Sequence, residues 1–478
     1  MILLETKRKN KTLDTIHFVG IGGIGISGIA EIMFNLGYKV QGSDVSESAN
    51  TKRLVDKGIR VIIGHNSANV SNVSYVVLSS AISEDNPEVL AAIDQSIPVI
   101  TRSQMLGELM RLKFSVAVSG SHGKTTTTSL IACLFEAAGL DPTVISGGLM
   151  NGKKTNAYLG SSDYLIVEAD ESDATFIKIP STVGIITNID PEHMDYYKDF
   201  NALTNAFESF LSNLPFYGFG VACIDHPVVR SLVSKVKDRK IITYGIESLD
   251  ANIVAHNIVL NSDSSVFDLK IKFAGRSGES MIQGIVLPLS GLHNVLNALA
   301  AIAIGVELDF GIKIIKDGFL KYQGVSRRFT NIGSYKGITF IDDYAHHPVE
   351  IKATLMAARS IVESRGSRVI AIFQPHKYTR LQNLFDEFTN CFSHAHEIYI
   401  TSVFAAGENK IESYDSENLC SALQNIHSHA SYITGEDNIS NMIKLNAKDK
   451  DIIIFMGAGD ITHTARSVLC KLERESCS

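Results

Sequence analysis

The chain has 478 residues, of which 45% are hydrophobic and 20% charged, and its net charge is −7. This balance is that of a soluble globular protein, and the negative charge argues against a general affinity for nucleic acid or acidic lipid. The six cysteines form no C-x-x-C pair and no zinc-binding spacing, which indicates free thiols in a reducing compartment. No apolar run resembles a signal peptide or reaches the ~20 residues of a membrane span, so we expect a cytoplasmic protein with no nucleic-acid and no membrane partner.

The first part of the chain alternates strands and helices around a glycine-rich turn. Strands are predicted over Ile16–Val19, Lys39–Ser43 and Tyr75–Leu78, with the turn at Gly20–Gly25 and a helix over Ser27–Leu36. A strand, a glycine turn and a helix in this order are typical of a Rossmann-like domain. At roughly 100–200 residues per domain we expect about three domains. The first is predicted to span residues 1–112.

A second domain is predicted over residues 113–325. Strands over Ser115–Ser119, Tyr164–Val167 and Val183–Thr187 are apolar without alternation, which predicts a buried, mostly parallel sheet. From Ala251 to Phe273 hydrophobic and polar residues alternate, which predicts an antiparallel β insertion. A helix is expected to follow over His293–Ile304.

A third domain is predicted over residues 326–478. It again alternates, with strands over Ile338–Ile341, Val369–Phe373 and Ile452–Phe455 and with helices beginning at Pro348 and Thr379. The predicted fold class is therefore α/β. A Rossmann-like N-terminal domain is followed by a central domain of the P-loop ATPase type, and then by a C-terminal Rossmann-like domain.

The strongest single motif is a phosphate loop at residues 120–126, between a predicted strand and a helix. Its glycines let backbone N–H groups face a phosphate, and the helix N-terminus adds partial positive charge. Lys124 would supply a point charge to the outer phosphates, and the Thr125 hydroxyl could ligate Mg²⁺. Val118 stands where the general pattern has its first glycine, so this is a shorter variant of the loop.

Acidic residues follow the next predicted strand. Glu168 ends that strand, which is the expected place for a magnesium ligand, and four carboxylates stand within the six residues 168–173. Such a cluster needs a cation or an ordered loop to offset its repulsion. His193, after a further strand, fits either a metal ligand or a surface histidine on these grounds alone.

The first glycine turn satisfies the dinucleotide fingerprint, because Gly20, Gly22 and Gly25 are followed about twenty residues later by Asp44. Such a loop binds a diphosphate and does not distinguish NAD from a nucleotide sugar. A dehydrogenase has no need of the second loop with its lysine and threonine. We therefore assign the first loop to a substrate diphosphate. Asp44 could bond a ribose or uracil group and His65 could lie nearby, although each could equally be structural.

In its ordered motifs the whole chain resembles the Mur ligases. Some of these segments resemble the alanine-adding branch in particular: residues 22–25, 79–82, 168–173 and 342–348. The matching segments are Gly20–Gly25 with Ser27-Gly28, Gly120–Thr126, Glu168–Asp173, Thr187–Asp195, His293-Asn294 with Asn297, Arg327–Phe329, Asp342–Pro348 and Phe373–His376.

The resemblance implies that the three domains hold the UDP-sugar, ATP and the incoming amino acid, in that order, and it supplies site residues. Thr125, Glu168 and His193 would hold Mg²⁺, and the catalytic set would be Lys124, Glu168, His193, His347 and Arg380. The nucleotide-binding set would be Gly120, Ser121, His122, Gly123, Lys124, Thr125, Thr126, His293, Asn294, Asn297, Arg327, Arg328, Asp342 and Asp343. The UDP-sugar set would be Gly22, Gly23, Ile24, Gly25, Ser27, Asp44, His65, Ser79 and Ser80.

Two positions depart from the family pattern. Ile26 stands where methionine is expected, which is a conservative change. Lys377 stands where arginine is usual, and lysine does not replace arginine in bidentate carboxylate binding. We therefore favour Arg380 as the residue that holds a carboxylate.

The expected activity is ATP-dependent ligation of L-alanine to the lactyl carboxylate of UDP-N-acetylmuramate through an acyl phosphate, in peptidoglycan precursor synthesis. The expected partners are these small molecules, with ATP and Mg²⁺, and the expected assembly is a monomer or a weak homodimer. A ligase that recycles a tripeptide onto the same sugar is the nearest alternative. An NAD-dependent oxidoreductase, based on the first glycine turn, and a non-catalytic nucleotide-binding regulator are alternatives from other classes.

Overall fold

The computed structural model describes residues 14–79, 81–111, 113–153, 155–172, 174–261, 263–272, 280–363 and 365–477. The chain forms two compact units. The first comprises Met1–His256, Asp268–Ile285 and Leu296–Gln323, and the second comprises Asn257–Phe267, Val286–Val295 and Gly324–Ser478. Among the described residues, no helix combines the length and the hydrophobicity needed to cross a membrane.

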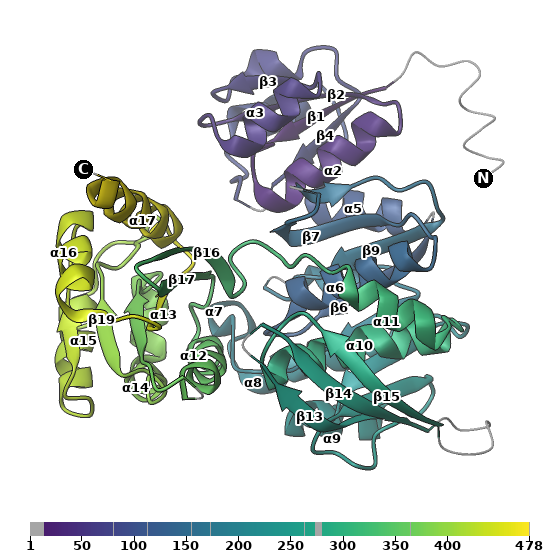
Figure 1. Ribbon diagram of the computed structural model, residues 1–478. Helices are drawn as coiled ribbons and strands as arrows, with labels where there is room; N and C mark the ends of the chain where they lie inside the picture. The colour runs from purple at the N-terminus through teal and green to yellow at the C-terminus, as the bar shows by residue number, and fades with distance from the viewer. Residues whose placement is uncertain are drawn as a thin grey trace. The chain divides into compact units, whose positions relative to one another are not determined.

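The N-terminal sheet is wholly parallel and has the strand order β3-β2-β1-β4-β5. Capping boxes at Ser48 and Thr101 begin two of its helices, because each side chain accepts the N–H of the third helical residue. The elements are β1 (Thr15–Val19), α2 (Ile24–Asn35), β2 (Lys39–Asp44), α3 (Ala49–Asp56), β3 (Arg60–Ile63), η1 (Ser67–Val70), β4 (Tyr75–Leu78), α4 (Pro87–Asp94), β5 (Val99–Thr101) and α5 (Arg102–Met110) (Figure 1).

The central sheet has ten strands in the order β15-β14-β13-β12-β11-β10-β6-β9-β7-β8. Its middle strands are parallel and almost fully buried, as their apolar sequences predict. The strands are β6 (Phe114–Ser119), β7 (Thr143–Met150), β8 (Thr155–Tyr158), β9 (Tyr164–Glu168), β10 (Val183–Ile186), β11 (Phe219–Cys223), β12 (Ile241–Gly245), β13 (Ile253–Leu260), β14 (Ser265–Ile271) and β15 (Ser280–Leu287).

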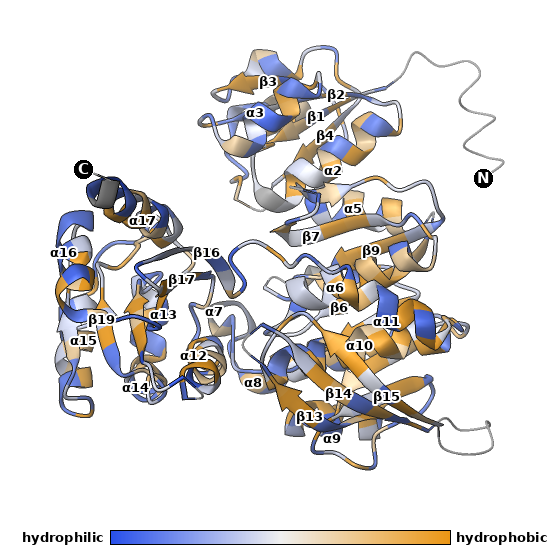
Figure 2. Cartoon of the chain, in the orientation of Figure 1, coloured by the Kyte–Doolittle hydropathy of each residue, from blue (hydrophilic) through white to orange (hydrophobic). Residues whose placement is uncertain are grey.

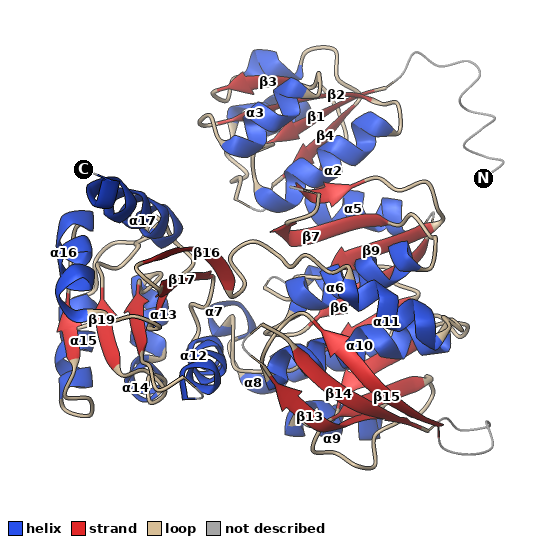
Figure 3. Ribbon diagram, viewed as in Figure 1, coloured by secondary structure: helices blue, strands red, loops and turns tan. Residues whose placement is uncertain are grey.

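Helices separate several strands of this part of the chain, whereas β12 to β15 follow one another with no helix between them among the described residues (Figure 3). The longest is α10, whose residues are predominantly hydrophobic (Figure 2). Its buried alanines and isoleucines account for its place in the core. The helices are α6 (Lys124–Ala137), η2 (Thr175–Lys178), α7 (Met194–Tyr197), α8 (Phe200–Ser212), α9 (Pro227–Lys235), α10 (Leu292–Glu307) and α11 (Ile312–Leu320).

Strands β13 and β14 lie within the predicted β insertion, and β15 follows beyond its predicted end. These strands do not form a layer of their own, because they extend the central sheet beyond β12, to which β13 pairs in parallel. The alternation in the sequence is visible in the burial of β14, where buried and half-buried residues alternate along the strand.

The C-terminal sheet has the order β16-β17-β21-β18-β19-β20, and every neighbouring pair is parallel except β16 with β17. The strands are β16 (Thr330–Tyr335), β17 (Ile338–Asp343), β18 (Val369–Phe373), β19 (Glu397–Ile400), β20 (Ala430–Tyr432) and β21 (Ile452–Met456). The helices are α12 (Pro348–Glu363), α13 (Tyr378–Asn383), α14 (Phe385–Asn390), α15 (Ser416–Gln424), α16 (Glu436–Asn446) and α17 (Ile461–Cys477).

The predicted α/β class with three sheets is confirmed. The domain boundaries at residues 112/113 and 325/326 stay a prediction, since the N-terminal and central sheets belong largely to one compact unit. In all three sheets the strands that carry the predicted motifs are parallel, so their carboxyl ends share one edge. The glycine turn, the phosphate loop and the loop after β17 each begin at the carboxyl edge of their own sheet.

Candidate active site

The phosphate loop joins the end of β6 to the start of α6. Gly123 is the N-cap of α6 and has φ +82°, and a Cβ at this position would lie 2.4 Å from the Asn297 amide oxygen. Only glycine therefore fits there. Thr127 Oγ1 donates to the same amide oxygen at 3.2 Å. The structure thus brings Asn297, on α10, against the loop.

The ammonium group of Lys124 is hydrogen-bonded to its own loop and to Glu171. Its Nζ donates to the carbonyl oxygens of Gly120 and Ser121, at 2.6 and 3.2 Å, and to the carboxylate of Glu171 at 2.8 Å. Burial alone would lower the pKa of Lys124, but Glu171 and three further carboxylates raise it above its ordinary value. Lys124 is therefore a cation at any physiological pH.

Thr125 and Glu168, two of the three predicted metal ligands, are in direct contact. Thr125 Oγ1 donates to the two carboxylate oxygens at 3.1 and 2.9 Å, and the Gly147 N–H donates to Oε2 at 2.6 Å. Two adjacent oxygen ligands, each about 2.1 Å from a magnesium ion, lie about 3 Å apart. The spacing and the oxygen chemistry of this pair fit the predicted cation.

His193, the third predicted ligand, lies beside Glu171. Its Nε2 is 3.7 Å from Glu171 Oε1, and its ligand atom forms a compact group with those of Asp170 and Glu171, all within 4.8 Å of one another. Burial lowers the pKa of His193, but the Glu171 carboxylate outweighs it and raises the pKa above its ordinary value. The His193 imidazole therefore lies beside the carboxylates of Asp170 and Glu171. Its role as a metal ligand stays a prediction.

The segment Thr187–Asp190, directly after β10, braces the phosphate loop. The Asn188 carbonyl accepts the N–H of Ser121 at 3.2 Å, and its side-chain oxygen accepts the N–H of His122 at 2.7 Å. The His122 carbonyl in turn accepts from Thr187 Oγ1 at 2.6 Å and from Asn188 Nδ2 at 3.1 Å. Ser121 Oγ donates to the Asp190 carbonyl at 3.3 Å and accepts the Asp190 N–H at 2.9 Å.

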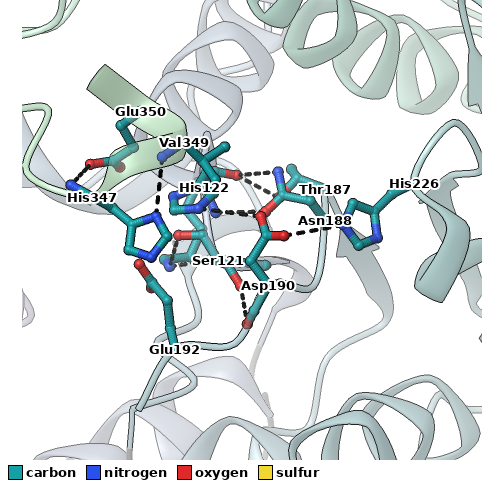
Figure 4. A network of polar contacts seen from close by, with 12 residues as sticks. Ser121, His122, Thr187, Asn188, Asp190, Glu192, His226, His347, Val349 and Glu350 are labelled. Atoms are coloured by element: carbon teal, nitrogen blue, oxygen red, sulfur yellow. Dashed lines mark hydrogen bonds and ion pairs between the residues drawn. The ribbon is translucent and has the colours of Figure 1, made fainter. Parts of the chain in front are cut away.

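The carboxylate of Asp190 lies between two histidines (Figure 4). Its Oδ2 is 3.3 Å from His122 Nε2, and its Oδ1 is 3.4 Å from His226 Nε2. Burial would raise the pKa of Asp190, but hydrogen bonds from the two imidazoles lower it well below its usual range. The His122 side chain is thus turned toward Asp190, and it is the loop backbone that remains for a phosphate.

The glycine turn of the N-terminal domain is closed by Asp44. Gly22 N donates to Asp44 Oδ2 at 2.8 Å, and Asn50 Nδ2 donates to the Gly22 carbonyl at 2.9 Å. The guanidinium of Arg102 packs so closely against Gly25 that a Cβ there would lie 2.6 Å from Nη1. A cation at the positive N-terminus of α2 is electrostatically unfavourable unless an anion joins it. This arrangement suits a diphosphate.

The other residues that are predicted to bind the UDP-sugar do not all lie beside the glycine turn. Ser79 packs under Gly20, whereas Ser27 is fully buried and its hydroxyl accepts from Arg53 at 3.4 Å. His65 Nδ1 lies 3.0 Å from Ser43 Oγ and 3.3 Å from Glu88 Oε2, away from the turn's own hydrogen bonds. Gly23 lies in the turn itself. Ser80 and the side chain of Ile24 lie outside the described residues.

In the second compact unit, Arg327 and the carboxylates that end β17 form one cluster. Arg327 Nη2 donates to the carbonyls of Gly457 and Gly459, and its Nε lies 3.8 Å from Asp342 Oδ1. Asp343 accepts two backbone N–H groups, and its burial raises its pKa to about 6. The side chains of Arg327 and Arg328 both lie over the ring of Tyr344.

The predicted amino-acid residues lie at the carboxyl ends of β17 and β18. The His347 N–H donates to Glu350 at 3.3 Å, and Arg380 Nη1 donates to His376 Nδ1 at 3.3 Å. His376 stacks on Phe404, with ring centroids 5.5 Å apart. Burial lowers the pKa of His376 to about 4, so this ring is neutral at pH 7.

Two predicted nucleotide-binding residues stand at the start of α10. Burial lowers the pKa of His293 to about 4, and nearby Arg328 adds to this effect. Asn294 Nδ2 donates to the Ser290 carbonyl at 2.8 Å. Thr126, the last residue of the predicted phosphate loop, is buried in the first turn of α6.

The prediction omitted several residues that the structure places in these sites. Glu171 lies in the acidic run at residues 168–173, but no feature of the sequence distinguishes it from its neighbours as the partner of Lys124. Asn188 and Asp190 precede His193 in the segment Thr187–Asp195, in which the prediction names only the histidine as a site residue. Arg102 and Glu88 carried no recognisable pattern, because their partners are distant in the chain.

Comparison with known proteins gives one consistent result. Family models match residues 15–114 (Mur ligase family, catalytic domain), 118–305 (Mur ligase middle domain) and 327–459 (Mur ligase, glutamate ligase domain). The UDP-N-acetylmuramate–L-alanine ligase of Rickettsia bellii is 59% identical over 470 residues, which cover 98% of each chain.

Solved structures agree with this result. The UDP-N-acetylmuramate-alanine ligase of Thermotoga maritima has a TM-score of 0.80 at 26% identity, over 96% of this chain and 99% of that one. A murein peptide ligase from Psychrobacter arcticus, at 22% identity and a TM-score of 0.68 over 96% and 98% of the two chains, shares the fold. On this evidence the chain belongs to the Mur ligase family.

Proposed function

We propose that this protein joins L-alanine to the lactyl carboxylate of UDP-N-acetylmuramate, with conversion of ATP to ADP and phosphate, in peptidoglycan precursor synthesis. The observation that carries the proposal is the pairing of two anion-binding loops in one chain. One ends in Gly25 beside Arg102, and the other carries Lys124 and Thr125 beside carboxylates. A relative that is 59% identical over nearly the whole chain bears the name of this activity.

The first loop would bind the diphosphate of the sugar nucleotide. Its N–H groups at the start of α2 and the guanidinium of Arg102 supply positive charge at this loop. The second loop would bind the triphosphate of ATP, with Lys124 moving from Glu171 to the outer phosphates. Two loops suit a reaction that uses two nucleotides, and they do not suit a dehydrogenase.

Thr125 and Glu168 would hold Mg²⁺, and His193 is proposed as a further ligand or as the partner of a ligating carboxylate. When bound, the ion would offset negative charge on the transferring phosphoryl group. Lys124 does the same from the loop, and its pKa lies far above neutrality, so it never loses this charge. Asp342 and Asp343, at the end of β17, are proposed to help hold the nucleotide from the C-terminal domain.

The chemistry must overcome the poor reactivity of a carboxylate. An oxygen of the lactyl carboxylate attacks the γ-phosphorus, the bond to ADP breaks, and an acyl phosphate forms. The ammonium group of alanine first loses one proton to water, and its neutral nitrogen then attacks the acyl carbon to form a tetrahedral species. Phosphate leaves with a second proton from the nitrogen as the amide forms. Both reactants are anionic, so positioning by cationic side chains contributes much of the lowering of the barrier.

Arg380 is the proposed cation for the alanine carboxylate. The neighbouring imidazoles cannot take this role, because burial lowers the pKa of His346 to about 3 and that of His376 to about 4. Since Arg380 donates to His376 Nδ1, the proton of that ring is on Nε2. His347, tied through its backbone to Glu350, is proposed to help orient the amino acid.

ADP release tests the proposal directly. Enzyme, ATP, Mg²⁺ and UDP-N-acetylmuramate should release ADP with L-alanine, and much less with glycine, L-serine, D-glutamate or L-lysine. Lys124→Ala should reduce turnover by at least a thousandfold while the UDP-sugar still binds. Near-normal turnover of this variant would overturn the assignment of the ATP site.

The acyl phosphate is tested by trapping. Hydroxylamine added to enzyme, ATP and UDP-N-acetylmuramate without alanine should yield a hydroxamate of the sugar nucleotide. Absence of the hydroxamate under conditions where alanine is ligated would count against this intermediate.

A tripeptide-recycling ligase remains the rival. Competition between L-alanine and the tripeptide, followed by mass spectrometry of the product, separates the two activities, and preference for the tripeptide would overturn the proposal. We place the enzyme in the cytoplasm, where ATP and nucleotide sugars are available, and propose a monomer or weak homodimer, which sedimentation over a range of concentrations would test.

A further inference from the structure

The antiparallel pair β7 and β8 joins the N-terminal domain to the central sheet, and all of these elements belong to one compact unit. Strand β8 is the last strand at one edge of the central sheet, and α2 of the N-terminal domain packs against it. Ile29 of α2 belongs to the same hydrophobic core cluster as Ile145 of β7 and Ala157 of β8. The helix that follows the glycine turn is therefore in direct contact with the sheet that carries the phosphate loop.

Gly28, in the family motif Ser27-Gly28, allows a very close approach of α2 to β8. A Cβ atom at Gly28 would lie 2.3 Å from the Ala157 Cβ, whereas carbon atoms in contact are about 3.5–4.0 Å apart. A methyl group at this position would therefore push α2 away from β8 by roughly 1–2 Å. Among the described residues, the next nearest atom outside the helix is the Ala157 Cα, at an ordinary distance of 3.7 Å.

A guanidinium spans the same interface. Arg53, on α3, donates from Nη1 to Thr155 Oγ1 at 2.9 Å and from Nη2 to Asn156 Oδ1 at 3.3 Å, and both acceptors lie on β8. Within its own domain Arg53 donates to the Glu31 carboxylate at 2.5 Å. The side chains of Arg53 and Glu31 are only 18% and 3% exposed. A planar group with several fixed donors holds both side chains of β8 at once, which an ammonium group cannot do.

Hydrogen bonds continue from this contact to both of the loops that are proposed to bind anions. On one side, Asn50 Oδ1 accepts from Arg53 at 3.5 Å, and Asn50 Nδ2 donates to the Gly22 carbonyl at 2.9 Å, in the glycine turn. On the other side, β8 pairs with β7, whose Gly147 N–H donates to Glu168 Oε2 at 2.6 Å. The β7–β8 pair therefore contacts both the domain of the glycine turn and the carboxylate that is proposed to hold Mg²⁺.

We propose that Gly28 and Arg53 are positioning residues. They hold the N-terminal domain on β8 at the distance that brings the lactyl carboxylate of the bound sugar nucleotide to the γ-phosphate of bound ATP. The inference rests on the proposed function, because it concerns transfer between these two ligands. Neither residue has to touch a substrate, since a displacement of about 1 Å between reacting groups can lower a rate about a hundredfold.

Gly28→Ala tests the position of α2. The kcat for ADP release by the full chain, with UDP-N-acetylmuramate, ATP, Mg²⁺ and L-alanine at saturation, should fall about a hundredfold. The Kd of UDP alone, and that of ATP with Mg²⁺ alone, should stay within about threefold of the wild-type values, because each loop follows a strand of its own sheet. Gly107→Ala, on α5, is the matched control, since its new methyl group would meet Pro180 at 3.5 Å, an ordinary contact. It should behave as the wild type does.

A compensating substitution tests whether the displacement causes the loss. Ala157→Gly removes the methyl group that the new side chain at position 28 would meet. The double variant Gly28→Ala/Ala157→Gly should therefore recover kcat to within about threefold of the Ala157→Gly single variant. A double variant as slow as Gly28→Ala would show that the clash with β8 is not the cause.

Arg53→Lys tests the polar contact, and it keeps a cation beside Glu31, so it remains informative if the Gly28 variant does not fold. The kcat should fall about tenfold in Arg53→Lys and in Asn156→Leu, with both Kd values kept. The double variant should be no slower than the slower single variant, because both substitutions remove the same contact. Arg60→Lys, at an exposed arginine of β3, is the matched control. Losses that multiply in the double variant would overturn the role of Arg53.

The outcomes distinguish this inference from the proposed function. If the wild type releases no ADP with UDP-N-acetylmuramate and L-alanine, the proposed function fails. If the wild type is active and Gly28→Ala keeps its kcat, the inference about position is wrong. It is also wrong if Gly28→Ala weakens the binding of UDP and leaves kcat unchanged, because the substitution then acts on the glycine turn itself.

Discussion

The ion pair between Lys124 and Glu171 holds in place the lysine that is proposed to act in catalysis. Glu171 is fully buried, and the Lys124 side chain is only 15% exposed, so neither charge is well solvated. A buried pair of this kind adds little stability over apolar residues, but removal of one partner leaves the other charge uncompensated. Its value to the enzyme lies in the preorganisation of the lysine.

Glu171→Gln should therefore destabilise the protein by roughly 3 kcal/mol, measured by urea unfolding at pH 7. Adding Lys124→Met should restore part of this loss, because the uncompensated ammonium is then gone. Glu307→Gln is the matched control, since its partner Lys240 is 55% exposed and such pairs contribute at most about 1 kcal/mol. Equal losses in the Glu171 and Glu307 variants would contradict this account.

The buried carboxylate of Glu88 makes the free energy of unfolding depend on pH. Its pKa is about 2 in the fold, against an ordinary value of 4.5 for a glutamate side chain, so the carboxylate stabilises the fold above pH 4.5. The difference corresponds to about 3 kcal/mol, which is lost as the pH falls from about 4.5 toward 2. Free energies of unfolding at pH 7, 5, 4 and 3 should show a steeper fall for the wild type than for Glu88→Gln. Parallel curves would show that Glu88 is not the responsible group.

At the scale of elements, the loop from β10 to α7 decides the shape of the phosphate loop. Thr187, Asn188 and Asp190 satisfy backbone groups of Ser121 and His122 that the turn cannot satisfy by itself. The same loop continues to His193. The proposed binding of a triphosphate would therefore depend on a segment that is 66 residues away in the sequence.

Asn188→Ala should raise KM for ATP about tenfold, because the turn loses both a donor and an acceptor, while KM for the UDP-sugar changes by less than twofold. Thr187→Val, which removes one hydroxyl and keeps the shape, should have a smaller effect in the same direction. Asn205→Ala, at an exposed position of α8, is the control. An equal rise in both KM values would indicate general disruption instead of a specific brace.

At the scale of the molecule, the two loops that are proposed to bind anions follow strands of different sheets and should respond to different ligands. Hydrogen exchange of the full chain should show protection near residues 20–25 and 64–66 with UDP, and near residues 120–126 with ATP and Mg²⁺. In Lys124→Ala only the second response should disappear. Each ligand at a hundred times its Kd adds about 2.7 kcal/mol of stability to the state that binds it. Protection of both loops by one nucleotide would contradict the assignment.

The sequence alone determined the strands and helices that flank the motifs, and it proposed most of the candidate site residues. The glycines, Lys124, Thr125 and Glu168 were predictable because their chemistry depends on local spacing around a strand end, which the linear pattern carries. The strands came out close to their predicted bounds for the same reason, since burial of apolar runs is a local property.

Only the tertiary structure decided which polar side chains pair with one another. Lys124 binds Glu171 out of four neighbouring carboxylates, Asn188 supports a loop far from it in sequence, and His65 joins Glu88. These choices depend on which strands lie side by side and on which polar atoms are left without water when the sheets pack. No local pattern encodes that, because a buried polar group selects its partner by distance and geometry in the folded chain.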